Sequence, residues 1–296
     1  MNERSTFLNS ILAIALLCGN VHAQTEVFSS SLDGDGTMFS VTENGDTSVT
    51  FQFDYSELGI PSAPNGDGTT GVRLASNLTA DDPGGGSAIA ISPGIDVSGQ
   101  YQVQFDFWLN FHINGSTEEG GAAIGFDGST PLAGSGLRVN TDGDSGTDYR
   151  LFDSTGTLGI DTGVYSIPSL DAQDAANVDI QAAFPAGVAP DAQGTGFTNP
   201  AGTFAFAWHT MLIDVDTNAE TATFSIDGFE FGTLTGGDYS GDIALLHTDP
   251  FGSVAGDVNL AFGVYDNLSV TQVPEPSSMM MLLCGIGMLR IRRRNK

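Results

Sequence analysis

The sequence predicts an all-β protein: an antiparallel β-sandwich with a hydrophobic helix at each end of the chain. Three observations support this fold class. Short runs rich in Val, Ile and Phe recur along the chain, each bounded by Gly, Asp, Asn or Pro, as in antiparallel sandwiches. Two longer apolar runs lie near the two ends. The 39 glycines show no Gly-X-Y period, and 19 Phe argue against a collagenous or disordered chain.

The first 23 residues have the organisation of a secretory signal peptide. Arg4 precedes an apolar run that ends at Cys18, and this run is too short for a stable membrane span. Val21-His22-Ala23 then fits a signal-peptidase site, with cleavage between Ala23 and Gln24. We therefore expect export through the Sec machinery and removal of residues 1–23 by signal peptidase.

Residues 24–272 form the predicted sandwich domain, which we call the body. Tyr101–Phe107 alternates strictly between apolar and polar residues, as a half-buried strand does. Thr223–Phe231 has the pattern of a hairpin, because Asp227-Gly228 supplies the positive φ angles of a two-residue turn. In chain order, the predicted strands are Met38–Thr42, Ser48–Phe53, Val72–Ala75, Ala88–Ser92, Tyr101–Ile113, Ala122–Phe126, Gly136–Val139, Tyr149–Phe152, Phe204–Val215, Thr221–Ile226, Phe229–Leu234 and Val258–Val270.

One segment of the body, Pro168–Gly202, differs from the rest. It is rich in Ala, Pro and Gly and poor in β-branched residues, which indicates a long loop or insertion with one short helix around Asp171–Ala183. Too few strands follow it to close a separate sheet. The sequence therefore predicts one sandwich and not two domains.

The body is strongly acidic. Of the chain's 36 acidic residues, all but Glu3 and Glu275 lie between Gln24 and Val273, which leaves 34 acids against three arginines and no lysine, a formal charge of −31. Such a surface repels phosphate groups, so we expect no binding of nucleic acid. Both cysteines lie in the terminal apolar runs, and the body therefore contains no disulfide.

Three motifs in the last third of the body resemble the final strands of concanavalin A-like, laminin-G-like jelly rolls. They are Leu212-Ile213-Asp214-Val215-Asp216, the turn Ile226-Asp227-Gly228, and the closing run Asp266-Asn267-Leu268-Ser269-Val270. The resemblance implies a jelly-roll sandwich, in a family that includes lectin-like binders and glycoside hydrolases. The hydrolase motif Glu-x-Asp-x-x-Glu is missing from the body, so the sequence predicts no catalytic set and no enzyme.

Acidic turns provide the candidate metal ligands, because oxygen-rich turns suit calcium. One set is Asp142 and Asp144, and the other is Asp214, Asp216 and Asn218. Neither set completes an EF-hand loop, and the alternative is a solvated surface of β-turns in which Asp bonds its own backbone. Asp214 and Asp216 also lie on one face of a strand, about 7 Å apart by strand rise, and form the acid pair that a diverged enzyme would use.

A second kind of candidate site is aromatic. Trp208 and His209 form a candidate ligand groove, in which the indole ring would stack on a sugar. The alternative is that both residues belong to the edge of the core.

The C-terminal segment 273–296 has three parts. The motif Val273-Pro274-Glu275-Pro276 precedes the apolar run Met279–Leu289 and a cluster of arginines at positions 290 and 292–294 (Arg290, Arg292, Arg293, Arg294). The basic end is expected to stay in the cytoplasm. A helix over residues 277–291 rises about 22 Å, short of the roughly 30 Å hydrocarbon core. The segment suits a transient anchor better than a permanent one.

This order of motif, apolar run and arginines resembles the PEP-CTERM sorting signal of Gram-negative bacteria. The resemblance implies transient anchoring in the inner membrane, cleavage by an exosortase-type membrane protease, and a final place on the outer surface or in the extracellular matrix. It also implies extracellular polysaccharide as a partner. The leading hypothesis is thus an exported, non-catalytic module that binds carbohydrate or another matrix component. A diverged glycoside hydrolase or polysaccharide lyase and a structural coat protein stay open as alternatives.

Overall fold

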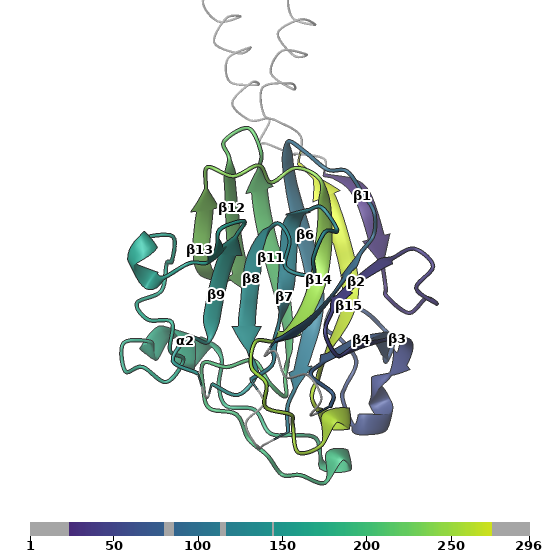
Figure 1. Ribbon diagram of the computed structural model, residues 1–296. Coiled ribbons are helices and arrows are strands. Elements are labelled where there is room, and N and C mark those ends of the chain that lie inside the picture. The colour runs from purple at the N-terminus through teal and green to yellow at the C-terminus, as the bar shows by residue number, and fades with distance from the viewer. Residues whose placement is uncertain (1–23, 80–85, 113–116, 144, 274–296) are drawn as a thin grey trace, which may run out of the picture. The chain divides into compact units, whose positions relative to one another are not determined.

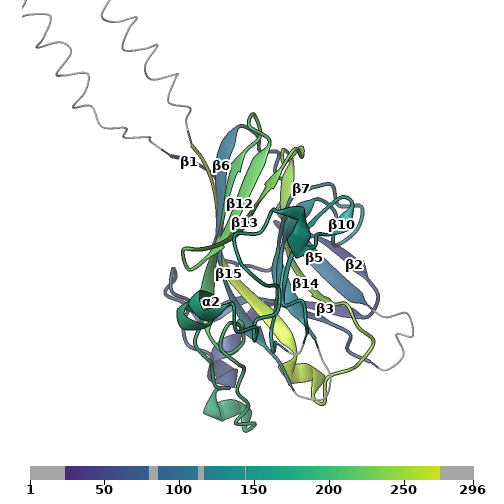
Figure 2. The ribbon, with the colours of Figure 1, turned by 90° about the vertical axis from the view of Figure 1, so that its left-hand side faces the viewer.

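The computed structural model describes residues 24–79, 86–112, 117–143 and 145–273 (Figure 1). Residues 26–271 form one compact unit. Two β-sheets pack face to face as two layers, which Figure 2 shows edge-on. Every strand pair with a defined register in the two sheets is antiparallel. The predicted all-β, antiparallel sandwich is confirmed.

The predicted signal peptide and the predicted sorting tail lie at the two ends of the chain. Residues 1–23 and the motif residues Pro274, Glu275 and Pro276, with the apolar run and arginines that follow, lie outside the described residues. Within the described ranges, no helix is long and apolar enough to cross a membrane.

The first layer, sheet A, has the strand order β13-β12-β11-β6-β15-β4-β3, and β1 pairs with β15 beside this path. Its strands are β1 (Thr25–Ser30), β3 (Thr47–Asp54), β4 (Thr70–Ser76), β6 (Gln100–Asn110), β11 (Trp208–Asp216), β12 (Thr221–Ile226), β13 (Phe229–Thr235) and β15 (Phe262–Gln272). Consecutive strands β11, β12 and β13 are neighbours, whereas β6 and β15 meet from distant parts of the chain.

The second layer, sheet B, has the strand order β10-β9-β8-β7-β14-β5-β2. Its strands are β2 (Ser40–Asn44), β5 (Ser87–Ser92), β7 (Glu119–Phe126), β8 (Ser135–Asn140), β9 (Tyr149–Asp153), β10 (Gly156–Thr157) and β14 (Asp242–Asp249). The central strand β14 lies between β7 and β5, and the sequence analysis did not predict it. Its Ala244 and Leu246 are buried on one face and Ile243 and Leu245 on the other, so the strand lacks the alternation that identifies half-buried strands.

The core lies between the two sheets. On β6, the side chains of Tyr101, Val103, Phe105, Phe107 and Leu109 point into it and are at most 1% exposed. The intervening side chains point to the outer face of sheet A, as the alternation predicts. The predicted hairpin is also confirmed: β12 and β13 join through the turn at positions 227–228, where both residues have positive φ angles.

Short helices occur only in the connections within the described chain. They are the 3-10 helices η1 (Tyr55–Leu58), η2 (Ile160–Thr162), η3 (Asp191–Gln193) and η4 (Val258–Leu260), and the α-helix α2 (Val178–Ala183). Helix α2 lies inside the range 171–183 where the insertion was expected to be helical. The N-terminal part of the predicted strand Val258–Val270 is η4, and β15 begins only at Phe262.

A second aromatic cluster covers one end of the outer face of sheet A. It includes Tyr55, Trp108, Phe111, Phe206 and Phe262, all buried. Phe111 contacts Phe206 at a ring-centroid distance of 4.9 Å and stacks on Phe197 at 6.5 Å, so the insertion and the chain just after β6 pack together. The rest of this outer face is polar, and the candidate site lies there.

Candidate functional site

The polar part of the outer face of sheet A is built from cross-strand pairs on β6 and β11. From one end of the two strands to the other, the pairs are Gln100 with Asp216, Gln102 with Asp214, Gln104 with Leu212, Asp106 with Thr210, and Trp108 with Trp208. Side chains directly opposite each other on one face of an antiparallel pair interact, so each pair is a local unit of this surface. The ladder passes from partly exposed amide–acid pairs at one end to the partly buried ring of Trp208 and the buried ring of Trp108 at the other.

The first two pairs account for the acids that the sequence analysis selected. Gln102 donates its side-chain amide to Asp214 at 2.5 Å, and Gln100 donates to Asp216 at 2.8 Å. The backbone N–H groups of Asn218 and Ala219 also donate to Asp216, at 2.9 and 3.0 Å. These bonds, first the one from Gln100, lower the pKa of Asp216. A general acid needs a raised pKa, which Asp216 does not have. Its bonds to Asn218 and Ala219 instead stabilise the β11–β12 turn.

The calcium prediction remains a prediction. In the described ranges, no group of three or more His, Cys, Asp or Glu side chains is arranged to hold a metal ion. Asp142 begins a turn in which its backbone N–H donates to Asn140 at 2.8 Å. Asp144 lies outside the described residues. Nearby, the carboxylate of Asp148 accepts from the Ala172 N–H at 2.7 Å, and burial raises the pKa of Asp148 to about 7.

Asp106 is the centre of the densest polar network on this face. Its side chain is fully buried and accepts four hydrogen bonds. Asn65 donates its backbone N–H at 3.0 Å and its side-chain amide at 2.7 Å. The Thr210 hydroxyl donates at 2.7 Å and the Asn267 amide at 2.9 Å. A carboxylate without donors would be unstable at this depth, so the four donors are the reason that the charge is tolerated.

This network fastens the segment 61–69, which we call the strap, across the outer face of sheet A. Pro61 accepts a hydrogen bond from the Trp208 indole at 2.7 Å, and Asn65 is held by Asp106. The Ala63 N–H donates to the hydroxyl of Tyr55 at 3.4 Å, and this hydroxyl lies 3.0 Å from the Gly68 carbonyl oxygen. The strap is therefore fixed at its start, middle and end.

The closing motif of β15 supplies the other side of the network. Asp266 accepts from the Tyr55 hydroxyl at 2.9 Å and from the Asn267 backbone N–H at 2.8 Å. Burial raises the pKa of Asp266 to about 7; the Tyr55 bond opposes this shift, while the charges of Asp33 and Asp106 add to it. Both carboxylate oxygens have partners within the protein. The side chain therefore shows no unsatisfied oxygen that would call for a cation.

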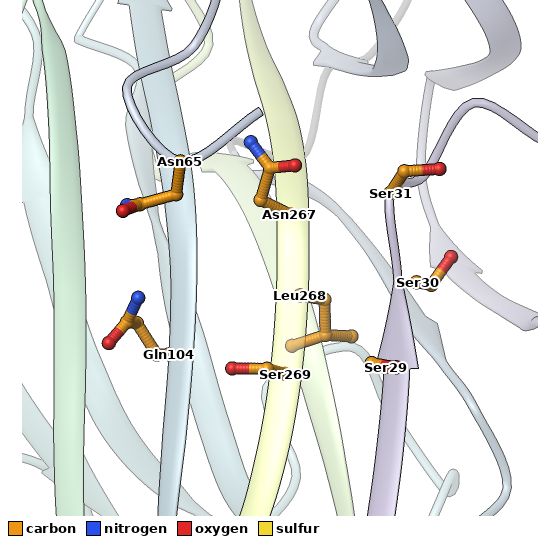
Figure 3. Close-up of a pocket in the computed structure, with 8 residues that line it drawn as sticks. All are labelled: Ser29, Ser30, Ser31, Asn65, Gln104, Asn267, Leu268 and Ser269. Atoms are coloured by element: carbon orange, nitrogen blue, oxygen red, sulfur yellow. The ribbon is translucent and has the colours of Figure 1, made fainter. Parts of the chain in front are cut away.

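A depression of about 370 Å³ lies beside the strap, between β6, β15 and β1 (Figure 3). Its lining residues are Ser29, Ser30, Ser31, Asn65, Gln104, Asn267, Leu268 and Ser269. Leu268 packs its side chain into the core, so the side chains that face the depression are hydroxyls and amides. Figure 3 shows Gln104 on β6 facing Ser269 on β15, with the serines of β1 along the opposite wall. No charged residue lines it among the described residues.

Several of these polar groups are unused. In the described part of the chain, no side-chain hydrogen bond is made by Ser29, Ser31, Gln104 or Ser269. The amides of Asn65 and Asn267, by contrast, are held in place by Asp106. The depression thus combines free donors and acceptors with a rigid, preorganised wall. This combination suits a polyhydroxylated ligand, since hydroxyl groups both donate and accept.

The predicted aromatic groove has a different geometry. Trp208 points to the outer face of sheet A, where it contacts Trp108 and Tyr55 at centroid distances of 6.0 and 5.3 Å. His209 points to the opposite face, into the core, and bonds Asp227 at 2.7 Å. Neighbouring residues of a strand face opposite sides of the sheet, so these two side chains do not line one groove together. Ligand binding by Trp208 stays a prediction.

The residues of the depression itself were not predicted from the sequence. The alternation of β6 placed Gln104 and Asp106 on a polar face, but a buried acid and an exposed amide look alike in that pattern. The strap carries Asn65-Gly66, a turn signal, without any sign of what the turn covers. Asn267 was part of the closing motif, and its backbone φ of 53° within a strand marks a local distortion.

Comparison with known proteins gives likeness in fold only. No protein-family model matches the chain, and no curated protein matches it. One similar solved structure is a Bacillus subtilis protein of unknown function with a galectin-like fold, at 11% identity and a TM-score of 0.43, covering 85% of this chain and 100% of that one.

Two others carry named activities. The Emp46p carbohydrate recognition domain, metal-free form, is 12% identical with a TM-score of 0.43 and coverage of 83% and 97%. The endo-1,3-β-glucanase from Streptomyces sioyaensis is 13% identical with a TM-score of 0.44 and coverage of 85% and 97%. At these identities and scores the likeness concerns only the kind of β-sandwich.

Proposed function

We propose that the depression on sheet A binds carbohydrate and that the body is a non-catalytic binding module. The observation that carries this proposal is the set of free hydroxyl and amide groups beside the Asn65–Asp106–Asn267 network. Sugar hydroxyls need such groups at fixed positions, because each bond formed must replace one with water. A volume of about 370 Å³ lies in the range of small-ligand sites.

The ends of the chain support a location for this activity. Residues 1–23 have the pattern of a signal peptide, and residues 273–296 have the order of parts of a PEP-CTERM tail. We propose that the protein is exported, held briefly in the inner membrane, and processed by an exosortase-type protease. A module that reaches the outer surface or the extracellular matrix meets polysaccharide there.

Binding is tested with the full chain on a glycan array, followed by titration calorimetry with the best glycan. Gln104→Ala and Ser269→Ala each remove one free polar group from the depression. Each is expected to weaken binding about three- to tenfold, since one hydrogen bond contributes about 0.5–1.5 kcal/mol. Gln100→Ala is the matched control, because Gln100 lies on the same strand and face but is bonded to Asp216.

Two results would count against the proposal. An array on which no glycan is retained contradicts carbohydrate binding. Equal losses in Gln104→Ala and Gln100→Ala contradict the depression as the site. Measurement of released sugar in the same samples tests the enzyme alternative, for which turnover of the bound glycan is the expected sign.

A further inference from the structure

Every cationic side chain of the body is already engaged inside the protein. The stretch 24–273 contains three arginines and no lysine. Arg73 is half-buried, donates to the carbonyls of Val258 and Asn259 at 3.3 Å, and lies 4.8 Å from the centre of the Phe262 ring. It is held against the aromatic cluster by these contacts.

The other two arginines are paired on the outer face of sheet B. Arg138 and Arg150 are 6% and 9% exposed, and both bond the carboxylate of Glu119, which is fully buried. Arg138 also donates to Thr157 at 3.0 Å, and Arg150 to Ser145 at 3.2 Å. None of the three guanidinium groups is available to an incoming anion at the depression on sheet A.

The charges next to the depression are carboxylates. Asp106 bonds two of its lining residues, Asn65 and Asn267. Asp33 lies against the strap, where its carboxylate is 3.7 Å from the position of a Cβ atom added to Gly68. An anionic group bound to either amide would therefore lie two hydrogen bonds from a buried carboxylate. Within the described residues lining the site, no cation would offset this repulsion.

We infer that the depression is selective by charge: it takes uncharged glycans and rejects polysaccharides that carry carboxylate or sulfate groups. This inference rests on the proposed function and names the class of ligand. The physical basis is a neutral hydrogen-bonding wall inside an acidic surface that has no free cation. Like charges across a recognition surface exclude the wrong ligand even when the uncharged contacts fit.

The test uses matched polysaccharide pairs and the full chain. The probes are laminarin and laminarin sulfate, dextran and dextran sulfate, and hydroxyethylcellulose and carboxymethylcellulose. For any pair whose neutral member binds, the anionic member is expected to bind about tenfold more weakly or worse at 0.01 M salt, where the Debye length is about 30 Å. The difference in affinity between the neutral and the anionic member is expected to become smaller at 1 M salt, where the Debye length is about 3 Å.

A pair of variants distinguishes the effect of a charge at the depression from the effect of the protein's overall charge on binding. Gln104→Arg puts a cation at the depression and is expected to raise the affinity for the anionic member at least about fivefold at low salt. Gln100→Arg adds the same charge farther along the same strand and is expected to have a smaller effect.

The outcomes are distinguishable. An anionic member that binds as tightly as its neutral partner at 0.01 M salt overturns the charge selection and leaves carbohydrate binding in place. Equal effects of the two arginine variants likewise overturn selection at the depression. Failure of every pair, neutral and anionic, contradicts the proposed function on which the inference depends.

Discussion

At the scale of single residues, Asp106 joins three parts of the chain that are distant in sequence. It lies on β6, bonds Asn65 of the strap 41 positions away, and bonds Asn267 of β15 161 positions away. A buried carboxylate of this kind is stable only while its donors are present. The same donors are the wall of the depression, so the stability of the protein and the shape of the site depend on one side chain.

Asp106→Asn tests this dependence. The asparagine keeps the shape but turns an N–H donor toward the donors of Asn65, Thr210 and Asn267, and it removes the charge that strengthens these bonds. The free energy of unfolding is expected to fall by about 2–4 kcal/mol, measured by urea unfolding. Asp214→Asn is the control: its acid is exposed and bonded only to Gln102 in the described structure, so a change within about 0.5 kcal/mol is expected. Equal changes in the two variants would contradict a special role for Asp106.

At the scale of elements, the strap makes the depression. Its residue Gly66 lies so close to β15 that an added Cβ atom would stand 2.5 Å from Oδ1 of Asn267. Asn267 cannot move aside without weakening the hydrogen bond that its amide donates to Asp106. Two residues later, a Cβ on Gly68 would meet nothing nearer than Asp33, at 3.7 Å. The two glycines therefore differ only in what they approach.

This difference gives a matched pair of variants. Gly66→Ala is expected to push Asn267 or the strap aside and to weaken glycan binding about fivefold or more, the effect of losing one hydrogen bond. Gly68→Ala is expected to bind as the natural chain does. Titration calorimetry on both variants, with circular dichroism as a check of folding, makes the comparison. Unchanged binding by a folded Gly66→Ala variant would show that the strap does not shape the site.

The elements also show which parts of the fold the sequence could predict. Tyr101–Phe107 and the hairpin at Asp227-Gly228 follow from local rules, since side-chain alternation and turn chemistry act within a few residues. β14 was missed because both of its faces are buried, which removes the alternation. The depression was missed for another reason: its parts come from β1, the strap, β6 and β15, and only tertiary contacts bring them together.

At the scale of the whole molecule, three buried acids make stability depend on pH in an unusual direction. Burial raises the pKa of Asp148 and Asp266 to about 7 and of Asp249 to about 6, from a value of 3.8. Between pH 4 and pH 7 the folded state therefore holds more protons at these sites than the unfolded state. Stability must then fall as the pH rises through this window.

One buried base acts in the opposite direction. Burial lowers the pKa of His247 to about 3 from 6.5, so its contribution to stability is present above 6.5 and is lost as the pH falls. Acids at the surface with a lowered pKa, such as the exposed Asp54 and the partly exposed Asp216, lose their contribution to stability only below about pH 4. Between pH 5 and 7.5, the loss of stability from the three acids is larger than the gain from the one histidine. Repulsion within a body of charge −31 also lowers the stability as the pH rises.

We therefore expect the thermal unfolding midpoint of the full chain to be higher at pH 5.0 than at pH 7.5, at constant ionic strength. A difference of about 3 °C or more is expected, since 1 kcal/mol shifts the midpoint of a domain of this size by about 2–4 °C. Asp266→Asn identifies one source of the trend, because the amide mimics the protonated acid that the fold prefers. It should raise the midpoint at pH 7.5 and leave it unchanged at pH 5.0, while Asp214→Asn, an exposed control, should keep the natural slope. A midpoint that rises from pH 5.0 to pH 7.5 would mean that the buried acids stay ionised in the folded protein, held by charges or ions other than those described.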